Sequence, residues 1–229
     1  MNLALTGEAS VLILDTCVLL DIIRSPVRRQ VARSHAEAIM EILNSLRAGN
    51  PRCRLVVPPV VREEFERNLS RVVEDTCVEL ERVFAEQAHA QTTLDVLLER
   101  EPSAPLAAAV ERWVGQCKAL ACEILERAFV EPTNADDHQR AFARSIGRRA
   151  PAKQGKDSVG DCLVTEFSLR LAKGFSTSGQ CEAIALVSSN TADYCEGRRL
   201  VPALQTEFDE AGLQYCRNWV EARRSVRLA

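Results

Sequence analysis

Apolar runs without alternation occur in the chain at residues 11–14 and 183–187, and further strand candidates lie at 54–57 (RLVV) and 213–216 (LQYC). An unbroken apolar run predicts a strand that is buried on both faces, as in a parallel sheet covered by helices. The intervening segments have helical periodicity instead. Strands that alternate with helices predict a three-layer α/β/α fold with a central parallel sheet.

The helical segments are bounded by prolines, glycines and polar stretches. Pro59 is placed as a first helical residue, and glycines at 174 and 212 predict helix ends. A polar stretch at 91–93 predicts a break in a long amphipathic segment, and 131–156 reads as a loop-rich segment. Helices are expected over residues 16–23, 30–47, from 59 into the middle of the chain, near 106–130, over 158–171 and over 201–211. The prediction is one domain over residues 1–229, with a helical insertion at about 70–150.

Composition restricts the class of protein. The chain has 229 residues, 46% of them hydrophobic and 27% charged, with a net charge of −3. This balance argues against a disordered chain and against a protein that coats duplex DNA non-specifically. No apolar run approaches the ~20 residues that span a bilayer, and no basic signal-peptide start is present. Nine cysteines without CxxC pairs or zinc spacing predict reduced thiols, so we expect a cytoplasmic protein with no membrane contact.

Acidic residues follow the predicted strands. Asp15 comes directly after the first run, Glu64 lies early in the helix after the second, and Asp193 follows the third. Asp157 and Asp161 open the helix before the third run, one turn apart. Each acid alone could be a helix cap or a solvated side chain. Because parallel strands connected by right-handed crossovers end at one edge of a sheet, we expect these acids to lie close together.

The acidic segments together resemble a known family. They read LDTCVLLD around Asp15, PPVVREEFE around Glu64, KDSVGDCLVTE around Asp157 and Asp161, and SSNTADY around Asp193. In this order they resemble the PIN (PilT N-terminal) domain nucleases, and the Lys-Asp pair before the third acid resembles the larger PIN-like subfamily. The resemblance covers roughly the first 70 and the last 75 residues, and leaves out the helical middle.

The resemblance implies a metal-dependent endoribonuclease that hydrolyses RNA. Oxygen ligands favour Mg²⁺ or Mn²⁺ over zinc. The implied metal ligands are Asp15, Asp157, Asp161 and Asp193, and the implied catalytic acids are Asp15, Glu64, Asp161 and Asp193. Thr16, Ser188 and Asn190 are expected to hold these carboxylates and waters or to contact phosphate. Beside the RNA substrate, an antitoxin or another regulatory protein and a second copy of the chain are compatible partners.

A basic segment precedes the third acid. It contains Arg144, Arg148, Arg149, Lys153 and Lys156. One interpretation is a solvated linker, since charged runs usually are. The other is a basic rim beside the metal edge that attracts the RNA backbone, with Arg148, Arg149, Lys153 and Lys156 as the contacts.

Two other functions use the same pattern. A PIN-like fold without catalysis would serve as a binding or interaction module. Another Mg²⁺-dependent phosphohydrolase, such as a haloacid-dehalogenase-like phosphatase, also begins with an Asp after a strand. That class needs a second Asp two residues later, where this chain has Cys17. No glycine-rich dinucleotide motif follows the first strand. The three histidines, among them His35, lie outside the strand ends and are expected to be surface or structural residues.

Overall fold

A central parallel sheet organises the computed structural model, which describes residues 9–28, 33–49, 53–101, 109–152, 158–178 and 181–226. Its five strands have the order β3-β2-β1-β4-β7. Their bounds are Ser10–Leu14 (β1), Cys53–Val57 (β2), Phe129–Val130 (β3), Ile184–Val187 (β4) and Gln214–Cys216 (β7). Cys195–Glu196 (β5) and Arg199–Leu200 (β6) form a separate antiparallel pair.

The strand β1 is the centre of the sheet. It is parallel to β2 on one side and to β4 on the other, with Leu12 opposite Leu55 and Ala185. Its five residues are all buried, as the unbroken apolar run predicts. The predicted strands at 11–14, 54–57, 183–187 and 213–216 are therefore confirmed within a residue or two. The two-residue edge strand β3 was not predicted.

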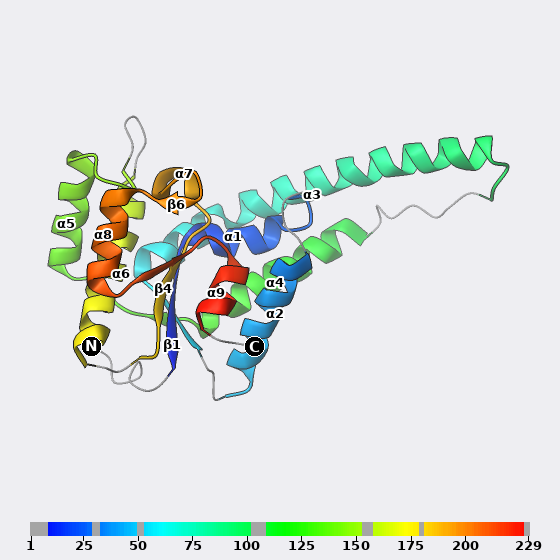
Figure 1. Ribbon diagram of the computed structural model, residues 1–229. Helices are drawn as coiled ribbons and strands as arrows, with labels where there is room; N and C mark the ends of the chain where they lie inside the picture. Colours follow the sequence, from blue (N-terminus) through cyan, green and yellow to red (C-terminus); the bar gives the residue numbers. More distant parts are fainter. Residues whose placement is uncertain are drawn as a thin grey trace.

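Helices cover both faces of the sheet, which confirms the three-layer arrangement. In Figure 1, α2 and α9 lie on one side of the strands and α6 and α8 on the other, with α5 outside α6. The helices are Thr16–Arg24 (α1), Arg33–Arg47 (α2), Pro59–Leu97 (α3), Val110–Arg127 (α4), Ala135–Ile146 (α5), Val159–Ser178 (α6), Thr191–Tyr194 (α7), Pro202–Ala211 (α8) and Trp219–Ser225 (α9). Within the described ranges, no helix is both long and apolar enough to cross a membrane.

Helix α3 is one continuous element, so the predicted break at 91–93 is wrong. The hydroxyls of Thr92 and Thr93 donate to the carbonyl oxygens four residues earlier, at 2.9 and 3.0 Å, which keeps these polar residues compatible with a helix. Figure 1 shows α3 running beyond the sheet as an arm, with α4 beside part of it. Phe84 and Trp113 join the two helices through an edge-to-face contact with ring centroids 5.6 Å apart. An exposed arm needs no long apolar face, which explains the polar composition.

Two further boundaries differ from the prediction. Helix α5 occupies part of the segment 131–156 that was expected to be a loop. Its start has a capping box between Asn134 and Asp137, a signal that the sequence contains. Helix α6 continues past Gly174 to Ser178, so no helix end lies at that glycine. Helix α8 does end at Gly212, which has the left-handed φ of 70° that glycine adopts without strain.

Candidate active site

Asp15 lies at the carboxyl end of β1 and is almost completely buried, at 4% exposure. Its carboxylate caps α1 by accepting from the Thr16 backbone N–H at 2.7 Å. It also accepts from the Ser188 hydroxyl at 2.6 Å and from the Cys17 thiol at 3.2 Å. Burial raises the pKa of Asp15, and these three hydrogen bonds offset that effect only in part. The ionised carboxylate is therefore held at an energetic cost that a bound cation would reduce.

Glu64 reaches the same edge from the second turn of α3. Its Oε2 accepts from the hydroxyl of Thr16 at 2.8 Å, so Thr16 joins Glu64 to Asp15. On the other side, Gly160 of α6 packs against it. A Cβ added to Gly160 would lie 2.6 Å from Oε1 of Glu64, closer than side chains tolerate. The glycine thus leaves the space that the Glu64 carboxylate occupies.

Asn190 connects the two remaining acids. Its Nδ2 donates to Asp161 at 3.2 Å and to Asp193 at 2.9 Å. Because one nitrogen atom binds both carboxylates, the two carboxylates lie close to each other. The Asn190 backbone N–H donates to the Ser188 hydroxyl at 3.2 Å. The N–H hydrogens of the side-chain amide, which carry partial positive charge, therefore lie between two carboxylates. A cation would be attracted most strongly to the same position.

These contacts form one continuous path along the carboxyl edge of the sheet. The path runs from Glu64 through Thr16, Asp15, Ser188 and Asn190 to Asp161 and Asp193. Four acids from four separate segments of the chain are thus brought to one place. Among the described residues, no three His, Cys, Asp or Glu side chains approach each other closely enough to hold a metal ion as they stand. The neutral partners Ser188 and Asn190 occupy the space between them.

Tyr194 packs against the backbone of Asp161. It is completely buried, and its hydroxyl donates to the Asp161 carbonyl oxygen at 3.2 Å and lies 3.1 Å from the Thr165 hydroxyl. Burial raises the pKa of Tyr194 well above its usual value, and the charges of Asp15 and Asp161 raise it further. The side chain is therefore neutral and serves to fix the start of α6 against α7.

Sequence reasoning missed two residues at this edge. The Cys17 thiol donates to Asp15 and its sulfur accepts from the Ser189 backbone N–H at 3.2 Å, contacts that the sequence does not predict. Asp21, about one turn further along α1, accepts from the Ser189 hydroxyl at 2.7 Å. Both lie in the segment that was singled out around Asp15, but their partners become visible only when β4 is placed beside β1.

The basic segment is divided by the fold. Arg144 is 1% exposed and is bound by Glu166 and Glu207, so its interpretation as part of a solvated or RNA-contacting rim is wrong. Arg149 is exposed and pairs with Glu207 at 2.6 Å, and Arg148 is exposed with a φ of 52°. Lys153, Lys156 and Asp157 lie outside the described residues.

Comparison with family models gives one match, to the PIN domain, over residues 12–194. The match spans most of the chain and contains all four acids. The chain belongs to the PIN domain family. Comparison with curated proteins and with solved structures gave no match.

PIN domains are generally nucleases and typically use divalent metal ions, and the geometry agrees with that class in one respect. The acids of this PIN domain come from the end of β1, from the first turns of α3 and α6, and from α7 after β4, where the sheet topology brings them together. The match also includes α3 and α4, the helical middle that the motif resemblance left out.

The contact between Gly160 and Glu64 gives a prediction. Gly160→Ala should displace the Glu64 carboxylate, and because side chains that position a metal site typically matter 10–100-fold, nuclease activity should fall by about that factor. The helix should remain folded, since alanine suits helices better than glycine. Gly115→Ala in α4 is the matched control, because nothing lies within 4 Å of its added Cβ. Equal cleavage by both variants would show that Glu64 needs no fixed position.

Proposed function

We propose that this PIN domain is an endoribonuclease that hydrolyses RNA phosphodiester bonds with Mg²⁺ or Mn²⁺ at the carboxylate edge. The observation that carries the proposal is the continuous hydrogen-bonded path that joins Asp15, Glu64, Asp161 and Asp193. Clustered carboxylates repel one another and would repel an RNA phosphate. A divalent cation removes both difficulties, and carboxylate oxygens are the ligands that Mg²⁺ and Mn²⁺ prefer.

The residues fit such an ion by their chemistry. Asp15, Asp161 and Asp193 are the proposed ligands, and in the described part of the chain no cationic side chain contacts Asp15. Asn190 lies between Asp161 and Asp193, so its amide would yield that space on metal binding. When bound, the ion would supply polarisation of a water and of the scissile phosphate. Asp157, the fourth ligand expected from the sequence, lies outside the described residues.

The chain's own side chains have separate roles in this proposal. Glu64, oriented by Thr16, accepts a proton from the attacking water or holds that water in line with the phosphorus atom. Ser188 fixes Asp15, and Asn190 holds Asp161 and Asp193 in place in the metal-free protein. Tyr194 and Cys17, both with pKa values raised by burial, stay neutral and hold the backbone around the acids.

The direct test is cleavage of a labelled single-stranded RNA, with a DNA of the same sequence beside it. We expect cleavage with Mg²⁺ or Mn²⁺ and none in EDTA. Asp193→Asn should reduce the rate about 10²–10³-fold, the usual size of a lost electrostatic contact to the reacting centre. Asp209→Asn, the same change on the exposed face of α8, is the control and should cleave normally.

Metal binding is measured separately by thermal unfolding. Mn²⁺ should raise the unfolding temperature of the wild-type protein, because a ligand that binds only the native state stabilises it. Asp161→Asn should lose that rise. A metal-dependent rise without cleavage of RNA or DNA would identify a binding module, and the absence of any metal effect would contradict the metal site itself.

A further inference from the structure

A cavity lies on the other side of the loop after β4, whose residues Ser188 and Asn190 bind three of the acids. It has a volume of about 610 Å³, within the range of small-molecule sites, and it lies between α1, α2, the β5–β6 hairpin and the start of α9. Ser189 and Thr191 line it, whereas Asn190 between them contacts Asp161 and Asp193. The cavity and the acidic edge are therefore separated by one loop only.

The cavity wall carries more positive than negative charge. Arg28, Arg198 and Arg217 line it, against the single carboxylate of Asp21. Arg28 pairs with Asp21 at 2.6 Å, which neutralises that acid. Arg217 is held by Glu221, and its Nη1 donates to the Arg198 backbone carbonyl at 3.4 Å. Among the described residues, the exposed guanidinium of Arg198 has no acidic partner. The positive charge of Arg198 is therefore available to bind an anion.

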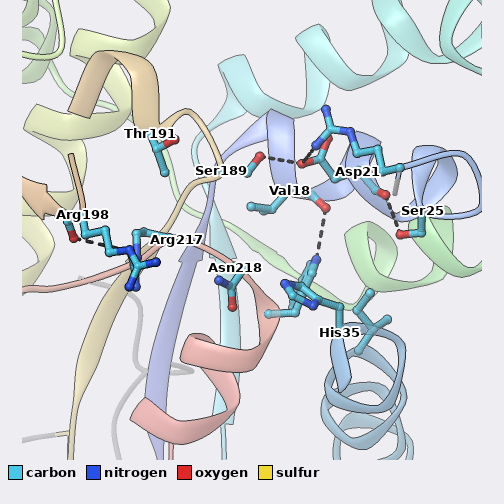
Figure 2. Close-up of a pocket in the computed structure, with 12 residues that line it drawn as sticks. Val18, Asp21, Ser25, His35, Ser189, Thr191, Arg198, Arg217 and Asn218 are labelled. Carbon is cyan, nitrogen blue, oxygen red and sulfur yellow. Dashed lines mark hydrogen bonds and ion pairs between the residues drawn. The ribbon is translucent and has the colours of Figure 1, made fainter. Parts of the chain in front are cut away.

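Two other features indicate what kind of anion fits. His35 lines the cavity, and its Nδ1 is buried without a hydrogen-bond partner in the described part of the chain. Buried polar atoms are rarely left unpaired, so a ligand atom is the natural partner. Val18, Ile39 and Trp219 give the wall an apolar portion, with the Trp219 indole fixed by donating to the Val18 carbonyl at 3.2 Å. In Figure 2, Arg198 and Arg217 lie on one side of the pocket and His35 on the other.

We propose that this cavity binds a nucleoside monophosphate unit, with its phosphate at Arg198 and Arg217 and its base against the apolar wall near His35. Arginine side chains suit phosphate oxygens, and bases stack on aromatic and apolar surfaces. The unit belongs either to the RNA strand next to the cut phosphodiester or to a free nucleotide. Only the first source rests on the proposed nuclease function, because the cavity itself contains none of the four acids.

The test is calorimetric binding of adenosine and uridine 5′-monophosphate to the full chain in EDTA, where the carboxylate edge cannot cut. Arg198→Glu should weaken binding about tenfold or more, the effect expected from losing a charge-assisted hydrogen bond. Arg112→Glu on the exposed face of α4 is the matched control, since it makes the same charge change away from the cavity. His35→Phe should weaken binding while keeping the aromatic volume.

A 2′-O-methyl RNA oligonucleotide separates the two sources. If it competes with the monophosphate, and Arg198→Glu weakens it too, the cavity holds part of the RNA strand. If it does not compete, the ligand is a free nucleotide. The proposal is overturned if no monophosphate binds, or if Arg198→Glu and Arg112→Glu bind it equally. Because these measurements need no metal, they remain interpretable if the chain proves not to cleave RNA.

Discussion

Asp15→Asn should abolish metal-dependent cleavage while leaving the fold intact. Asp15 is a buried acid at the end of the central strand and a proposed metal ligand. Losing such a ligand removes several kcal/mol of transition-state stabilisation, so a fall on the order of 10³-fold is expected. Asparagine has the same shape. Its oxygen can accept from the Thr16 N–H, and its amide can donate to the Ser188 hydroxyl. Cleavage rates with Mg²⁺ and Mn²⁺, beside a circular dichroism spectrum, measure both halves of the prediction.

The same variant has a signature in stability without metal. The pKa of Asp15 is raised in the folded protein above its ordinary value of 3.8, so folding favours the protonated form. Its stabilising contribution is present below that ordinary value and is lost as the pH rises through the folded pKa. In EDTA, Asp15→Asn should therefore unfold at a higher temperature than wild type at pH 7, with a smaller difference near pH 4. Asp95→Asn, a buried acid on the α3 arm, should cleave RNA normally. Near-normal cleavage by Asp15→Asn would end the catalytic assignment.

Arg144→Met should be the most destabilising single change among the charged residues of α5. The guanidinium is buried between Glu166, whose Oε1 lies 2.6 Å from it, and Glu207, and it also donates to the Ala150 carbonyl at 2.6 Å. Removing one partner of a buried ion pair leaves uncompensated charge and typically costs about 3–5 kcal/mol. Urea unfolding of the metal-free protein measures this loss.

Arg149→Met is the matched control for that change, because Arg149 binds the same Glu207 from an exposed position. Exposed pairs contribute only about 0–1 kcal/mol. Adding Glu166→Met to Arg144→Met should recover part of the loss, since apolar residues replace buried ion pairs well. Equal midpoints for the two arginine variants would mean that water reaches the Arg144 cluster.

The central strands β1, β2 and β4 could be predicted because they are almost entirely buried between the helical layers. The run VLIL at 11–14 admits few other interpretations, whereas β3 has only two exposed residues at the sheet edge and leaves no comparable pattern. The errors lie where burial is one-sided or absent. Polar residues at 91–93 belong to a projecting arm, and the charged sequence of α5 conceals Arg144, whose burial depends on acids far along the chain.

The site could be predicted as a set of acids but not as a geometry. Strand ends placed Asp15 and Asp193 at one edge, since parallel topology requires it. For Thr16, Ser188 and Asn190 the sequence predicts contacts with carboxylates, waters or phosphate, but not which acid each one binds. The roles of all these residues remain predictions that the proposed variants test. Cys17 and Asp21 acquire their partners from the loop after β4, about 170 residues away, so no local pattern could reveal them.

That loop also limits how the chain can vary in length. Ser188 bonds Asp15, Ser189 bonds Asp21, and Asn190 bonds both Asp161 and Asp193. Deleting or inserting a single residue in this loop would shift all three side chains, so that none would still lie opposite its present acid. The outer part of α3 contacts no strand, so its length is not fixed by contacts of this kind. Length changes in this PIN domain are therefore tolerable in the arm and intolerable at this three-residue junction.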